Sequence, residues 1–107
     1  MALTHSFRDS VVDDIRRNPA LAKALLDEAA TLFLNGEPDI ARLVLRDLVN
    51  ATVGFERLAI LTSKPSKSLH RMLSERGNPS MDNLATIFDA VRRKLKVGIT
   101  AKSRSAA

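Results

Sequence analysis

The chain has 107 residues, 45% of them hydrophobic and 27% charged, and its formal net charge at pH 7 is +5. This composition predicts one small globular domain and excludes a chain that is disordered throughout. The sequence has no cysteine, which excludes disulfides, thiolate metal sites and a cysteine nucleophile.

The N-terminal residues predict a short amphipathic helix over residues 6–17. Phe7, Val11 and Ile15 are spaced four residues apart, so they would share one face of this helix. Asp9 lies near its start, where the helix dipole favours a negative charge.

Two longer helices are expected next. Asn18-Pro19 supplies an N-cap and a first-position proline for a helix that extends to about residue 35, where Asn35-Gly36 is a stop signal. A third helix begins at Glu37-Pro38, carries apolar residues on one face and ends before Gly54. We expect these two helices to pack as a helical hairpin.

The rest of the chain predicts two short helical segments joined by a tight turn at about residues 55–75, then a longer helix that Ser80 caps and Gly98 ends. No convincing period-2 strand occurs, so the predicted fold is all-α with five to six helices. One domain would span residues 1–99, and the small or polar residues 100–107 would form a flexible tail.

Charge is distributed unevenly along the chain. Residues 1–50 hold six Lys or Arg against eight Asp or Glu, whereas residues 51–107 hold eleven against four. A basic half is typical of a protein with a polyanionic partner such as DNA, RNA or an anionic membrane. An ordinary solvated surface accounts for the same charge.

Residues 55–75 have the spacing of a helix-turn-helix. Ala59 is small enough for the point where two steeply crossing helices touch, and Leu69 and Met72 would fix the underside of the second helix. The other side of that helix would be polar, with Ser66, Lys67, Ser68, His70 and Arg71. Arg and Lys pair with guanine edges or phosphates, and Ser fits several base edges, so this face is typical of a helix in a major groove.

This segment resembles the Cro/C1-type (Xre-like) helix-turn-helix domain in Leu58-Ala59, in residues 66–74 and in residues 77–84. Over about residues 7–99 the chain looks like the addiction-module antidote proteins, the HigA-like antitoxins that partner RelE/HigB-type toxins. The resemblance implies an antitoxin that binds its cognate ribonuclease toxin. It also implies repression of its own operon by binding a palindromic operator in double-stranded DNA as a homodimer.

The resemblance also implies the DNA-binding residues. Lys67 and Arg71 are the strongest candidates because they lie four residues apart on one exposed face. The full set of DNA-binding candidates is Ser66, Lys67, Ser68, His70, Arg71, Lys64, Asn78, Ser80 and Asn83. The last three flank the start of a helix, whose free amides could hold a phosphate, but Ser80 is also an ordinary N-cap and Asn78 ordinary turn chemistry.

The turn departs from the family pattern at three positions. Ser63 stands where the family usually has glycine, and Thr62 and Lys64 stand where it usually has apolar residues. A left-handed serine is less favourable than glycine, so we expect a less regular turn. Pro65 partly offsets this because it fixes the backbone that enters the second helix.

Other surface features have two interpretations. Cations near the end of the last helix could extend a DNA track or could simply stabilise the helix C-terminus: Arg92, Arg93, Lys94 and Lys96. Arg57 could flank the DNA backbone. Ile60 falls where related motifs expose a polar residue; we expect it in the core, with a second subunit or a toxin as alternatives. Acidic residues of the first half would suit a basic toxin: Asp9, Asp13, Asp14, Asp27 and Glu28.

No catalytic residue, metal or cofactor is predicted. His5 and His70 lack the spacing of metal ligands, and the sequence has no glycine-rich phosphate loop and no Gly-x-Ser-x-Gly elbow. No apolar run of about 18 residues and no leader pattern occurs, so we expect an unprocessed cytoplasmic protein. The alternatives to the antitoxin are a solitary Xre-like regulator and a protein-binding module that does not bind DNA.

Overall fold

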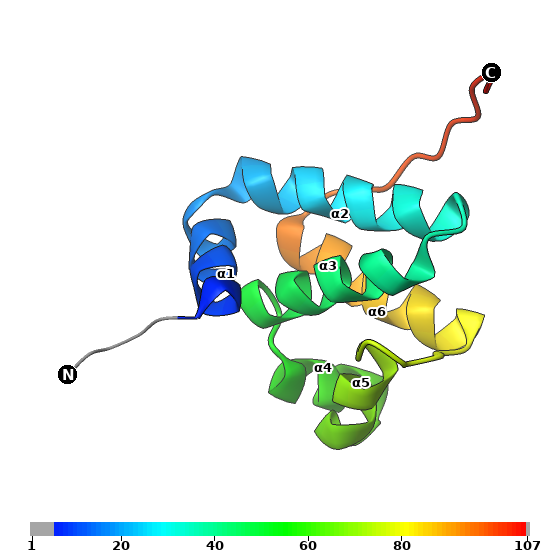
Figure 1. Ribbon diagram of the computed structural model, residues 1–107. Coiled ribbons are helices and arrows are strands. Elements are labelled where there is room, and N and C mark those ends of the chain that lie inside the picture. The colour runs from blue at the N-terminus through cyan, green and yellow to red at the C-terminus, as the bar shows by residue number, and fades with distance from the viewer. Residues whose placement is uncertain (1–5, 107) are drawn as a thin grey trace.

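The computed structural model in Figure 1 describes residues 6–106 of the chain. It contains six helices: α1 (Phe7–Arg17), α2 (Pro19–Leu34), α3 (Pro38–Ala51), α4 (Phe55–Thr62), α5 (Ser66–Met72) and α6 (Met81–Leu95). No strand occurs among these described residues. The all-α prediction is therefore confirmed.

The helices form a body with a smaller pair below it. In Figure 1, α2 and α3 lie side by side over most of their length, and α1 packs across one end of them. α6 passes under this hairpin and contacts both α2 and α4. α4 and α5 pack on each other at the lower end, so this pair is the part of the fold that projects furthest from α2.

Three of the helices begin at polar N-cap side chains, of which the sequence identifies Asn18 and Ser80. The side-chain oxygens of Ser6, Asn18 and Ser80 each accept a hydrogen bond from the backbone N–H three residues later, at 3.1–3.2 Å. These bonds satisfy one of the amide groups left free at a helix start. The predicted starts of α1, α2 and α6 are thus confirmed.

The buried side chains form one core cluster to which every helix contributes. One fully buried residue from each helix, all at most 2% exposed, illustrates this: Ile15, Leu26, Leu45, Leu58, Leu69 and Ile87. Burying each such aliphatic side chain contributes about 1.5–3 kcal/mol. The short helices α4 and α5 are held by this shared core rather than by their own propensity.

The end of α6 differs from the prediction. The helix stops at Leu95, three residues before Gly98, and Lys96 takes the left-handed conformation with φ 60°. The N–H of Val97 donates to the Arg92 carbonyl at 3.0 Å, which is the long bond of a Schellman motif. Val97 packs against the core after this turn, so a non-local apolar contact sets the end of the helix.

Candidate nucleic-acid interface

A connection of three residues joins α4 to α5. Ser63 has φ 54° and ψ 36°, the left-handed conformation that the family pattern normally gives to glycine. The N–H of Lys64 returns to the Ala59 carbonyl at 3.2 Å, which closes the end of α4. Pro65 then precedes the first residue of α5 in an extended conformation, with φ −60°.

The underside of α5 is fixed by apolar contacts. Leu69 and Leu73 are 1% and 0% exposed, and Met72 packs partly buried against the same cluster. Leu58 of α4 lies in that cluster, with Ala59 partly buried beside it. The apolar side of α5 and the buried face of α4 therefore share one core.

The opposite side of α5 is polar and faces solvent. Lys67, His70 and Arg71 are exposed, while Ser66 and Ser68 are half-buried. A guanidinium nitrogen of Arg71 lies 3.4 Å from the Ser68 hydroxyl, which is a long hydrogen bond. Within residues 6–106, Lys67 and Arg71 form no ion pair with a carboxylate, so both charges are available to a ligand.

His70 has a structural contact that its position on the polar face does not predict. Its ring stacks on Phe55, the first residue of α4, with ring centroids 3.8 Å apart and an interplanar angle of 17°. Phe55 is buried, and one face of the imidazole covers it. Only the remaining face and edges of His70 are open to a ligand, so its first role is to tie α5 to α4.

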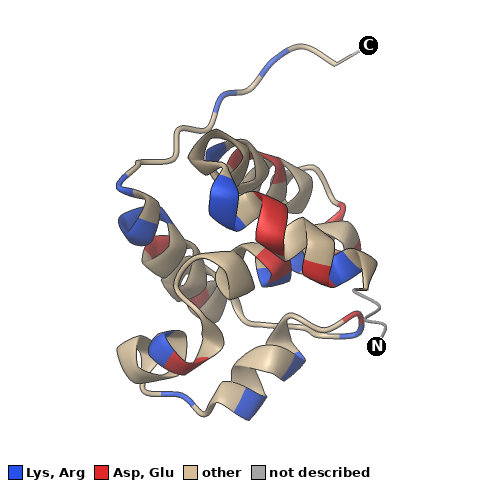
Figure 2. Cartoon of the chain, turned by 90° about the vertical axis from the view of Figure 1, so that its left-hand side faces the viewer, with Lys and Arg blue, Asp and Glu red and all other residues tan. Residues whose placement is uncertain are grey.

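Basic residues gather around this end of the molecule. Figure 2 shows Lys and Arg segments on α4, on the α4–α5 turn and on α5, together at the lower end. In residues 55–74 these are Arg57, Lys64, Lys67 and Arg71, against the single carboxylate of Glu56. The local charge of this stretch is therefore +3, and it lies on the part of the fold that projects from the body.

The basic half of the sequence does not form one surface. Figures 1 and 2 both place the C-terminal segment at the upper end, on the side opposite to α4 and α5. The cations Lys102 and Arg104 of that segment are thus far from the polar face of α5. The cations of residues 51–107 therefore lie on separate surfaces, because chain order and spatial order differ here.

The cations near the end of α6 are largely engaged within their own helix. Arg92 and Arg93 pair with the same carboxylate, Asp89, at 2.6 and 2.9 Å. The hydrogen bond from Arg93 is the main reason that the pKa of Asp89 lies below its usual value, and Arg92 adds to the effect. This arrangement favours the stabilising interpretation of the cluster, leaving Lys94 and Lys96 exposed.

The start of α6 has three polar side chains that are predicted to contact phosphate, and one of them caps the helix. Ser80 caps the helix by accepting from the Asn83 N–H at 3.1 Å. Asn78 is exposed and Asn83 is half-buried. Capping alone accounts for Ser80, whose contact with phosphate stays a prediction.

Ile60 is not in the core. Ile60 is 68% exposed and its neighbour Leu61 is 52% exposed, so the expectation of burial is wrong. The reason is helical geometry: the buried face of α4 is set by Phe55 and Leu58, and Ile60 lies about 200° around the helix from Leu58. Two adjacent aliphatic side chains are thereby left in solvent next to the basic turn.

Sequence reasoning missed Arg42 of α3. Its side chain is buried, with 7% of the residue exposed, and it donates to the backbone carbonyls of Ser74 and Glu75 at 3.1 and 2.8 Å. It also pairs with Asp39 at 2.9 Å. One feature of the sequence indicates that Arg42 is buried: it lies three residues before Leu45, on the apolar face of the helix.

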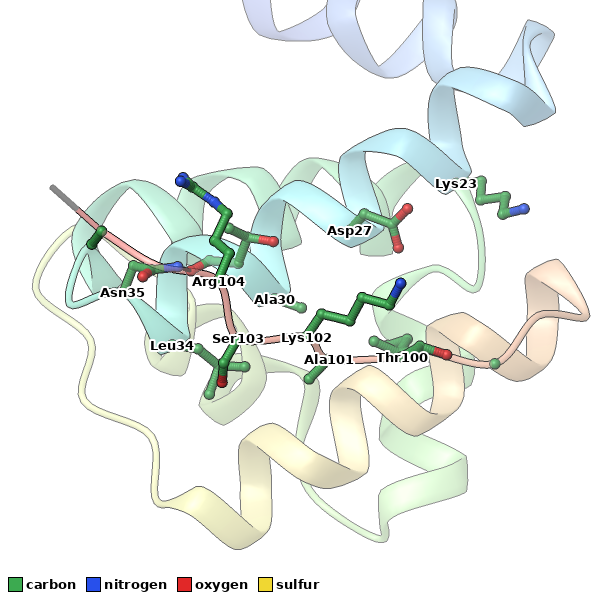
Figure 3. A pocket seen from close by; sticks show the side chains of 14 residues that line it. Lys23, Asp27, Ala30, Leu34, Asn35, Thr100, Ala101, Lys102, Ser103 and Arg104 are labelled. Atoms are coloured by element: carbon green, nitrogen blue, oxygen red, sulfur yellow. Dashed lines mark hydrogen bonds between the residues drawn. The ribbon is translucent and has the colours of Figure 1, made fainter.

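A hollow of about 770 Å³ lies away from α5, between α2 and residues 98–106. Figure 3 shows its lining, which includes Lys23 and Asp27 of α2 and Lys102 of the C-terminal segment. Among the described residues no group of three or more His, Asp or Glu is placed to hold a metal ion. His5 lies outside the described residues.

Comparison of the chain with protein-family models, curated proteins and solved structures gives no match. None of the helices described between residues 6 and 106 is long and apolar enough to cross a membrane. The assignment of α4 and α5 to a DNA-binding motif therefore stays a prediction, which rests on the residues quoted for the resemblance and on their chemistry.

Proposed function

We propose that the chain binds double-stranded DNA through the exposed face of α5. The observation that carries the proposal is that Lys67 and Arg71 lie on that face without a carboxylate partner among the described residues, while Leu69 fixes the other side of the helix in the core. A rigid cationic helix face presents its charges without first having to order them.

The dimensions of α5 fit this role. An α-helix with its side chains is about 10–12 Å in diameter, and a B-DNA major groove is about 12 Å wide, so α5 with its seven residues can enter it. Arg71 would pair with a guanine edge and Lys67 with a phosphate, with Ser66 and Ser68 close to the bases. Lys64 and Arg57 would contact the flanking backbone, and the start of α6 would hold a further phosphate.

Following the family resemblance, we propose that the DNA-binding protein is a cytoplasmic type II antitoxin. It would neutralise a RelE/HigB-like ribonuclease toxin and, as a homodimer, repress its own operon, with no catalytic activity of its own. Support for a protein partner comes from the exposed Ile60 and Leu61, since adjacent aliphatic side chains in solvent are typical of a contact surface. The acidic residues of α1 and α2 would suit a basic toxin.

A mobility-shift experiment tests DNA binding. The probe is duplex DNA from upstream of the chain's own coding sequence, and the variant is Lys67→Ala with Arg71→Ala. The matched control is Lys102→Ala with Arg104→Ala, which removes the same charge from the opposite end of the molecule. We expect the first variant to lose the shift and the control to keep it, with wild-type binding weakening steeply as salt is added. Equal loss in both variants, or none in the first, would contradict the proposal.

The exposed aliphatic pair also favours a second candidate, a protein-binding module that does not use DNA. Co-purification with the product of the adjacent gene separates the two functions. In the leading proposal, Ile60→Ser with Leu61→Ser weakens the protein complex and leaves DNA binding unchanged. A chain that forms the complex but never shifts its upstream DNA, even at low salt, would support the module instead.

A further inference from the structure

We propose that the buried Arg42 of α3 is a positioning residue for the DNA-contacting face of α5, and that it acts through Ser74 on Arg71. The inference rests on the proposed function, because it assigns a second residue to the same site. Arg42 does not reach the surface that would touch DNA: 7% of the residue is exposed. Its effect on a ligand of α5 must therefore be indirect.

The first step is the contact between Arg42 and the chain that leaves α5. The guanidinium donates through Nε to the Ser74 carbonyl at 3.1 Å and through a terminal nitrogen to the Glu75 carbonyl at 2.8 Å. A buried charge is unfavourable unless its hydrogen bonds are satisfied. The planar fork of arginine satisfies both carbonyls at once, which fixes this segment against α3.

The second step leads from Ser74 to Arg71. The Ser74 hydroxyl donates to the Arg71 carbonyl at 2.7 Å, and the Ser74 N–H donates to the same carbonyl at 3.2 Å. The Ser74 carbonyl, held by Arg42, also accepts from the Gly77 N–H at 3.0 Å. Two consecutive hydrogen-bonded links therefore connect the buried guanidinium to the backbone of the residue that would contact a base.

The third step is the weakness of α5 by itself. The helix has seven residues and no side-chain N-cap hydrogen bond, and helices this short are marginal in water. In the last turn of α5, the ring of His70 stacks on Phe55 and ties the helix to α4. Arg42 supplies the corresponding tie beyond its C-terminal end, where a cation also favours the helix dipole.

The experiment compares Arg42→Met with a matched control, Arg46→Met. The control removes the same charge one turn further along α3, where the side chain forms no hydrogen bond within residues 6–106. Ser74→Ala and Arg42→Lys are milder variants, and the same measurements are made on them if Arg42→Met does not fold. Two quantities are measured in the full chain: amide hydrogen exchange across residues 66–77, and affinity for the upstream duplex DNA.

We expect Arg42→Met and Ser74→Ala to speed exchange in residues 66–77 more than in α2, and Arg42→Lys to restore part of the protection. We also expect both variants to weaken DNA binding about tenfold, the size of one lost base contact. In a Lys67→Ala, Arg71→Ala background, assayed at low salt so that weak binding to the duplex can still be measured, the same changes should have no further effect, because the residues through which they act are gone.

Uniform acceleration of exchange throughout the core, or an undiminished effect of Arg42→Met in the Lys67→Ala, Arg71→Ala background, would overturn the positioning role. Either result would leave DNA binding by the wild-type chain standing. Failure of the wild-type chain to bind the duplex would instead overturn the proposed function, and the positioning role for DNA with it, whatever the exchange pattern shows.

Discussion

At Gly77 the backbone passes too close to the end of α5 for any side chain. A Cβ at this position would lie 2.1 Å from the Met72 carbonyl oxygen and 2.6 Å from that of Arg71. Both contacts are with backbone, which cannot rotate away. Gly77 and Arg42 thus hold the same segment from two sides, and only glycine permits the approach.

Gly77→Ala should lower the free energy of unfolding by about 2 kcal/mol or more, because the segment after α5 must move to admit the methyl group. Chemical denaturation measures the change. Gly98→Ala is the matched control, since nothing lies within 4 Å of the added Cβ and φ is not positive there. A Gly77→Ala chain as stable as the Gly98→Ala chain would show that residues 71–77 are packed more loosely.

A partly buried ion pair joins α1 to α3. Arg8 hydrogen-bonds to Asp47, which is 5% exposed. Burial raises the pKa of the Asp47 carboxyl above its usual value, although Arg8 opposes the shift. A raised pKa means that the folded state holds the proton more tightly, so this group's contribution to stability is present at low pH and is lost as pH rises through the folded pKa.

Arg8→Met should therefore destabilise the fold in a pH-dependent way. Without the guanidinium the pKa of Asp47 rises further, so the loss relative to wild type should be small below about pH 3.5, where the carboxyl is protonated in both states, and should grow to about 1–2 kcal/mol at pH 7. Urea denaturation across this range measures it. Arg17→Met on the same helix should show no such trend, and a pH-independent loss for Arg8→Met would argue against the pair.

Among the elements, the starts of helices are predictable from sequence and their tertiary supports are not. Asn18 and Ser80 identify the starts of α2 and α6 because a cap is a local interaction over three residues. The prediction that α6 ends at Gly98 is wrong: the helix ends at Leu95, and Val97 packs against the distant core. The candidate face of α5 follows from helical spacing. The position of Arg42 on the apolar face of α3 indicates burial, but its partners lie more than thirty residues away in the chain and have no local signal.

The α4–α5 turn keeps a strained residue. Ser63→Gly should stabilise the chain by about 0.5–1 kcal/mol, because glycine adopts the left-handed conformation of Ser63 without steric conflict. Thermal denaturation tests this. In α1, Ser10→Gly serves as the control and should lower stability by about 0.5 kcal/mol, since its backbone is helical. If Ser63→Gly does not stabilise the chain, the left-handed conformation of Ser63 is not strained.

The start of α6 allows capping and phosphate contact to be separated. Ser80→Asp should keep stability within about 0.5 kcal/mol of wild type, because aspartate caps a helix well and suits its dipole. The added negative charge should nevertheless weaken binding to duplex DNA if a phosphate lies there, as proposed. Ser80→Ala, in contrast, should lose about 1 kcal/mol of stability. Unchanged DNA affinity for Ser80→Asp would leave Ser80 as a cap alone.

In the whole molecule, cations of the second half lie at separate places. One group surrounds α5, a second is paired within α6 and a third lies on the C-terminal segment at the opposite end. The charge counted along the sequence predicts a polyanionic partner, but it does not show which surface of the fold would bind that partner. The folded arrangement makes the α4–α5 end the candidate, since Arg57, Lys67 and Arg71 are exposed there and Glu56 is the only carboxylate in residues 55–74.

The most direct test of the central claim is a titration of the isotope-labelled chain with its upstream duplex DNA, followed by NMR amide shifts. We predict that the shifts concentrate in the α4–α5 turn, in α5 and at the start of α6, with little change in α2 or in residues 98–106. Shifts centred on Lys23 and Lys102 at the opposite end, or no shifts at low salt, would contradict DNA binding by α5.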